Sequence, residues 1–167
     1  GGVAANIVPE RAVAQFYVRA SRRKYLDEVV EKVKNVARGA ALMTGAKLQI
    51  CNYEISYDNM NTNRNLSQAF NNNLLSVGVK DIKPAGSGSG SIDMGNVSRV
   101  VPSIHPYIGL DCPDIAGHTR EMADRTISEA GRKALINGTA ALALTGYDVI
   151  SKPALLEGIK KEFEESK

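Results

Sequence analysis

The sequence has few of the residues that build disulfide frameworks or metal clusters. It contains no tryptophan, two histidines and two cysteines among 167 residues. Cys51 and Cys112 lie far apart in the sequence and form no Cys-x-x-Cys pair. This spacing argues against a disulfide framework and against a zinc motif built on cysteine. We therefore expect two unpaired thiols, as in a cytoplasmic protein.

Charge of one sign and long apolar runs are also scarce. The net charge is only +3, and the cations are spread along the chain rather than gathered in a basic stripe with interleaved aromatic residues, so we expect no nucleic-acid partner. No apolar run approaches the ~18 residues that cross a bilayer, so we expect no membrane partner. The sequence has no initiator methionine and no signal-peptide pattern, and its first residues are typical of a domain interior. We therefore expect a piece of a longer protein.

The composition that is present is typical of a globular α/β protein. Hydrophobic residues make up 43% and charged residues 23% of the chain, and 167 residues suffice for one domain or two small ones. After Asp58 the composition changes, because asparagine becomes frequent. We therefore expect two parts, 1–58 and 59–167.

The first part shows a pattern of strand, helix and strand. Apolar residues alternate over 11–20, which predicts a half-buried strand ending near Arg19. From the expected N-cap Ser21 to Gly45 they recur every three or four residues, which predicts an amphipathic helix. Residues 47–57 alternate again. This order is half of a small α/β sandwich.

The second part predicts shorter elements. We expect a linker at 61–63 and then a helix to about Leu75, because Leu66, Phe70 and Leu74 recur every four residues. Further on we expect an edge strand at 80–84, a helix beginning within 93–100 beside a closely packed Gly95, and a strand at 103–110. The stretch 120–151 should be largely helical, with breaks at Gly131, Gly138 and Gly146. A last helix should run from Pro153 through Lys167.

The stretch from Gly86 to His118 is the candidate site. It opens with alternating glycine and serine, passes Asp93, and contains both His105 and His118. Glycines let a backbone approach another group closely. The alternatives are a flexible connector with structural histidines, and a phosphate-binding loop, which would need a lysine motif that this stretch lacks.

Several segments, taken in order, resemble one family, the zinc metallopeptidases of the aminoacylase and carboxypeptidase G type. Residues 1–10 with Phe-Tyr-Val-Arg at 16–19 resemble the middle of its lid, or dimerisation, domain. Residues 90–98 are similar to its glycine-serine-threonine-aspartate segment, and residues 116–119 to the segment that holds its last metal-ligand histidine. Residues 100–107 and 147–159 most resemble the amidohydrolase branch with p-aminobenzoyl-glutamate hydrolase and basic-dipeptide hydrolases.

The resemblance implies the second half of a lid, an α/β sandwich, followed by the C-terminal part of an α/β catalytic domain. His118 would be a ligand of a two-metal site, usually zinc, in which metal-activated water attacks an amide carbonyl. Arg19 would hold the substrate's carboxylate with a bidentate guanidinium. Asn6 and His105 would also contact the substrate, an N-acyl amino acid or a dipeptide. The cleft wall would be formed by Gly90, Ser91 and Asp93.

The departures from the family pattern limit what this sequence does alone. Ile92 stands where threonine or serine is common. The other metal ligands and the general-base glutamate belong before Gly1 in this family. We therefore expect the 167 residues to be inactive by themselves, and to associate with the missing N-terminal half and, through the lid, with a second copy. The alternative is a non-catalytic dimerising or scaffold protein derived from such an enzyme.

Overall fold

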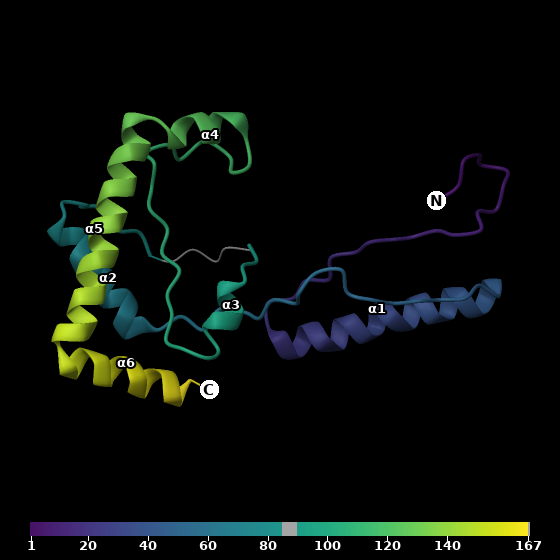
Figure 1. Cartoon of the computed structure of the whole chain (residues 1–167), viewed down its shortest axis with the longest axis horizontal. Coiled ribbons are helices and arrows are strands. Elements are labelled where there is room, and N and C mark those ends of the chain that lie inside the picture. The colour runs from purple at the N-terminus through teal and green to yellow at the C-terminus, as the bar shows by residue number, and fades with distance from the viewer. Residues whose placement is uncertain (85–89, 167) are drawn as a thin grey trace. The chain divides into compact units, whose positions relative to one another are not determined.

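The computed structural model describes residues 1–84 and 90–166 (Figure 1). The chain divides into two compact units, Gly1–Ser56 and Tyr57–Lys167. Part of the glycine-serine loop (86–89) and the expected helix end at Lys167 lie outside the described residues. Across the described ranges, every helix is too short or too polar to span a membrane.

The first unit contains a single long helix, α1 (Arg23–Thr44). Its N-cap is Arg22, in an extended conformation, so the expected cap at Ser21 was one residue too early. The expected end at Gly45 is confirmed: Gly45 adopts the left-handed conformation (φ 70°), and the amide of Ala46 donates to the carbonyl of Ala41 at 3.1 Å. This six-to-one bond is typical of a glycine-terminated helix.

The strands expected at 11–20 and 47–57 are wrong as strands. Both segments are drawn as plain trace (Figure 1), and among the described residues of the chain none lies in a β-strand. Alternating apolar residues describe the two faces of an extended segment, but a strand also needs a neighbour that completes its backbone hydrogen bonds. The α/β sandwich is therefore not confirmed, and the described chain is helix-rich.

The second unit packs helices around a small core. Its helices are α2 (Arg64–Ser76), α3 (Met94–Val97), α4 (Arg120–Thr126), α5 (Glu129–Ser151) and α6 (Pro153–Glu165). Figure 1 shows α2 beside the long α5, with α6 running crosswise from the end of α5. Phe70, Leu74 and Ala141 form the buried cluster. The helices expected before Leu75, over most of 120–151 and from Pro153 are confirmed.

Two extended segments complete this core without forming strands. Ile82, from the edge strand expected at 80–84, packs against the buried cluster together with the preceding Val79. Ile104 and Ile108, from the strand expected at 103–110, pack there too. The only β-type pairing in the described part of the chain is an isolated parallel bridge between Thr62 and Ser103. Both strand predictions are therefore wrong, although burial of their apolar residues explains the pattern.

The glycines of α5 do not break the helix, and two of them, Gly131 and Gly138, allow close packing. Helix α5 runs without interruption through Gly131, Gly138 and Gly146, so the expected breaks are wrong. A Cβ at Gly131 would collide with the carbonyl of Thr126, and one at Gly138 would lie 3.2 Å from Cγ1 of Ile108. The close packing expected at Gly95 is confirmed, because a Cβ there would collide with the carbonyl oxygen of Asp58.

Candidate functional site

Arg19 lies at the end of an extended segment, above an aromatic ring. Its guanidinium carbon is 5.7 Å from the centroid of the Tyr17 ring, within the range of a cation–π contact. Tyr17 and Arg19 are two residues apart, so they share a face of extended chain. The ring of Tyr17 in turn contacts that of Tyr53 edge-on, with centroids 6.0 Å apart.

The hydroxyl of Tyr17 is held by a carboxylate. Its single proton is donated to the carboxylate of Glu54, whose two oxygens lie 3.0 and 3.2 Å from the hydroxyl oxygen. Hydrogen bonding with the Tyr53 side chain, the hydrogen bond to Glu54 and the negative charge of Glu54 raise the pKa of Tyr17 to about 12. The phenol therefore remains a protonated donor throughout the neutral pH range.

The guanidinium of Arg19 is exposed, and its donors are available. In the described residues it forms neither a hydrogen bond nor an ion pair, with Glu10 or with any other acid. A guanidinium with a supported plane and unused N–H groups has the geometry for two-pronged binding of a carboxylate.

Asn6 lies in a tight turn of the same unit. The amide of Ile7 donates to the carbonyl of Ala4 at 3.2 Å, and the Asn6 side chain is exposed. Within the described chain no hydrogen bond joins Asn6 to Arg19. The structure therefore leaves both side chains accessible, and a shared role in substrate binding stays a prediction.

His118 lies in the loop that precedes α4, in a left-handed conformation (φ 62°). The hydroxyl of Thr119 fixes this loop, because it donates to the carbonyl of Ala116 at 2.8 Å and accepts from the amide of Met122 at 3.2 Å. The imidazole of His118 is exposed and makes no hydrogen bond to any described residue. Its ring nitrogens are therefore available to a ligand.

Arg125 holds the beginning of the same loop. Its guanidinium donates from Nε to the carbonyl of Leu110 at 2.7 Å and from a terminal nitrogen to that of Asp111 at 3.0 Å. Asp111 is the other non-glycine residue with a positive φ (52°) in the described chain. The segment between Leu110 and Thr119 is thus tied to α4 at both ends, which limits where His118 can lie.

The other predicted site residues are spread over the second unit. His105 is half-buried and stacks edge-on against Tyr107, with centroids 5.1 Å apart, a contact that also suits a structural histidine. Gly90, Ser91 and Asp93 are exposed, and Asp93 is the N-cap residue of α3 without a side-chain cap bond. Whether these residues line a cleft stays a prediction.

The described residues do not bring together a complete metal site. Across 1–84 and 90–166, no group of three or more histidine, cysteine, aspartate or glutamate side chains could hold an ion. Since a zinc site needs three or four protein donors, His118 fits a metal only as one donor among others. Cys51 and Cys112 are free thiols, as expected.

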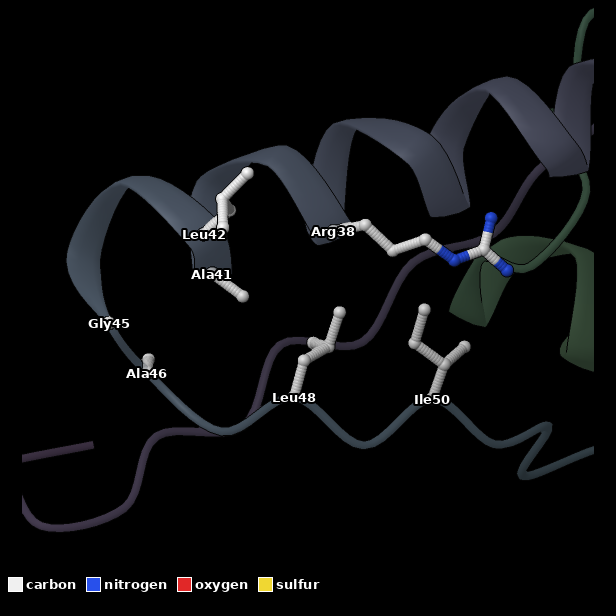
Figure 2. A pocket seen from close by; sticks show the side chains of 7 residues that line it. All are labelled: Arg38, Ala41, Leu42, Gly45, Ala46, Leu48 and Ile50. Atoms are coloured by element: carbon white, nitrogen blue, oxygen red, sulfur yellow. The ribbon is translucent and has the colours of Figure 1, made fainter.

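A shallow groove lies in the first unit between α1 and the segment that follows it. In Figure 2 Leu48 and Ile50 point from the extended segment toward Ala41 and Arg38 of the helix. Apart from the Arg38 guanidinium its lining carries no ionisable side chain. The groove therefore offers apolar surface rather than acid–base chemistry.

Sequence reasoning missed the residues that hold the predicted ones in place. Tyr17 was visible through its spacing from Arg19, but Tyr53 and Glu54 lie more than thirty residues further on. Their pairing depends on the register of two extended segments. Arg125 gave no signal beyond a basic residue in the last turn of a helix.

Comparison with known proteins identifies relatives along nearly the whole chain. It is 38% identical to a mouse protein named Xaa-Arg dipeptidase and 35% identical to the human protein of that name, each over 167 residues and 98% of the chain. It is 26% identical, over 85% of the chain, to an N-acetyldiaminopimelate deacetylase of Leuconostoc mesenteroides. No family model matches the chain.

The chain spans 38% of the length of the two dipeptidases and 35% of that of the deacetylase. All three names describe hydrolysis of an amide bond, and the matches agree with the family that the sequence segments resemble. The chain belongs to this amidohydrolase and peptidase family.

Proposed function

We propose that this chain forms the C-terminal part of a metal-dependent amidohydrolase that cleaves the amide bond of a dipeptide or an N-acyl amino acid. The observation that supports this most strongly is the identity of 38% to a dipeptidase over 98% of the chain. The exposed guanidinium of Arg19, supported on Tyr17 and without an intrachain acid in the described residues, fits a substrate with a free carboxylate.

In this proposal Arg19 binds and orients the substrate. Arg19 donates two parallel hydrogen bonds to the terminal carboxylate, which fixes the position of the adjacent amide bond. The amide of Asn6 and the imidazole of His105 hydrogen-bond nearby polar groups of the substrate. Gly90, Ser91 and Asp93 form the wall of the cleft.

His118 supplies one ligand to a divalent metal, zinc in a two-metal site, and the other ligands and the general base come from outside these 167 residues. A bound metal supplies a water nucleophile at neutral pH. The left-handed turn and the hydroxyl of Thr119 fix the backbone of the loop that carries His118. The protein is cytoplasmic and dimerises through the lid unit.

The test uses the full-length protein, encoded by the complete reading frame that contains this sequence. With zinc it should hydrolyse dipeptides that carry a C-terminal arginine faster than the same dipeptides with an amidated C-terminus. Arg19→Ala should lower kcat/KM for the free acids at least about tenfold, because each hydrogen bond to a charged group contributes roughly 1.5–3 kcal/mol. Arg19→Lys should recover activity only in part, since an ammonium keeps the charge but loses the planar fork.

Arg11→Ala, at an exposed arginine of the same extended segment, is the matched control and should behave as the wild type. If Arg19→Ala lowers the melting temperature yet keeps the preference for free acids, Arg19 does not bind the carboxylate. If no dipeptide or N-acyl amino acid is hydrolysed with any divalent metal, the non-catalytic dimerising protein becomes the better description.

A further inference from the structure

We propose that Tyr17 and Glu54 are positioning residues for Arg19: the ring of Tyr17 supports the guanidinium, while its hydroxyl engages Glu54 and keeps that carboxylate from pairing with Arg19. This inference rests on the proposed function, because it concerns how the carboxylate-binding arginine is kept ready. It follows from the side chains that the two extended segments of the first unit bring together.

Arg19 has a supported position without a competing anion. Its guanidinium carbon lies 5.7 Å from the Tyr17 centroid, a distance at which the ring face attracts a cation. The ring is itself held by an edge-on contact with Tyr53 and by two hydroxyl contacts to Glu54. An arginine held on a fixed ring loses less side-chain freedom on binding a ligand than one that moves in solvent.

Glu54 is the acid that would compete with the substrate carboxylate for Arg19. It meets Tyr17, the residue on which Arg19 rests, yet it forms no ion pair with Arg19 within the described chain. Both of its oxygens lie within hydrogen-bond distance of the Tyr17 hydroxyl instead, at 3.0 and 3.2 Å. A carboxylate released from this bond would be an internal competitor for the guanidinium that the substrate needs.

The two roles of Tyr17 can be separated by substitution in the full-length protein. Tyr17→Phe keeps the ring and removes the hydroxyl, so Glu54 is released toward Arg19. We expect KM for a dipeptide with a free C-terminus to rise roughly threefold to tenfold, with kcat unchanged and with no change for the C-terminally amidated dipeptide. Adding Glu54→Gln to Tyr17→Phe removes the competing charge and should restore KM to within about twofold of the wild type.

Tyr25→Phe is the matched control, because Tyr25 is an exposed tyrosine of the same unit, and it should leave both substrates unaffected. The inference is overturned if Tyr17→Phe behaves like Tyr25→Phe, if it raises KM equally for acid and amide, or if Glu54→Gln fails to restore the double variant. Arg19→Ala, measured in parallel, separates this failure from that of the proposed function. If Arg19→Ala keeps the preference for free acids, the carboxylate clamp itself is wrong.

Discussion

At the scale of single residues, the backbone around a side chain decides whether that side chain can serve a site. The alternation of 11–20 placed Tyr17 and Arg19 on one face, and the structure joins them through a ring contact. The partners on the facing segment, Tyr53 and Glu54, could not be predicted, because no local pattern encodes the register of two extended segments. A similar limit applies to His118: the family resemblance implied a metal ligand, but its left-handed turn and the bonds of Thr119 emerge only in three dimensions.

Replacing His118 tests whether its imidazole is a metal ligand. In the full-length protein, His118→Asn should lower zinc affinity at least about tenfold and reduce hydrolysis together with metal content. Asparagine tolerates a positive φ, so the melting temperature without metal should stay close to that of the wild type. Metal content is measured by mass spectrometry after equilibrium dialysis.

His105→Gln is the control for that experiment, since His105 is proposed to contact substrate and should keep the metal. Full metal content in His118→Asn would show that this imidazole is not a ligand.

At the scale of elements, the helices were predictable and the strands were not. A helix closes its hydrogen bonds within its own segment, so its apolar period and end signals such as Gly45 and Pro153 locate it. A strand completes its hydrogen bonds only with a neighbour, so alternation over 11–20, 47–57 and 103–110 identified extended chain without a sheet. The helix breaks expected at the glycines of α5 were wrong for a related reason. Gly131 and Gly138 accommodate Thr126 and Ile108, which lie outside the helix.

Several hydrogen bonds join α6 to the beginning of α2 in the second unit. The carboxylate of Glu162 accepts from the backbone amides of Arg64 and Asn65 at 2.8 and 2.9 Å, where α2 begins. The side chain of Asn63 caps α2 by accepting from Leu66 and donates to the carbonyl of Ile159 at 2.9 Å. Asn63 is 3% exposed, so its bond to Ile159 is made away from water and fastens α6 to the beginning of α2.

The Glu162 contact predicts a pH dependence. Burial alone would raise the pKa of this carboxyl, but the bonds from the Asn65 and Arg64 backbone and from the Asn65 side chain hold the pKa below its ordinary value. A lowered pKa contributes stability that is present above the unfolded-state pKa and is lost as the pH falls through the folded-state value. Glu162→Gln should therefore destabilise the chain by about 1 kcal/mol at neutral pH, and the difference should shrink in acid.

Urea unfolding of the 167-residue chain at a series of pH values measures this difference. Glu157→Gln, at an exposed acid of the same helix, should leave the free energy of unfolding unchanged at each pH. A Glu162→Gln effect that stays constant into the acid range would mean that the carboxylate charge is not what stabilises the cap.

At the scale of the whole molecule, the chain leaves much apolar surface uncovered. No side chain in the described unit Gly1–Ser56 is buried, although α1 is amphipathic. The C-terminal end of α1 borders the apolar groove. In the second unit α5 buries small residues such as Ala141, while Leu135 and Ile150 on the same helix are 69% and 84% exposed. A helix that is apolar on both sides normally has partners on both sides.

We therefore expect the 167-residue chain, prepared by itself, to associate. Its weight-average sedimentation coefficient should rise with protein concentration, and it should bind a dye specific for exposed apolar surface. Val36→Glu, at a position 74% exposed on α1, should weaken association by placing a charge on the uncovered face. Lys24→Glu, at an exposed polar position of the same helix far from Val36, is the control and should leave association in place. A chain that stays monomeric at every concentration and binds no dye would mean that this apolar surface needs no partner, which would remove the physical reason for the proposed pairing through the lid unit.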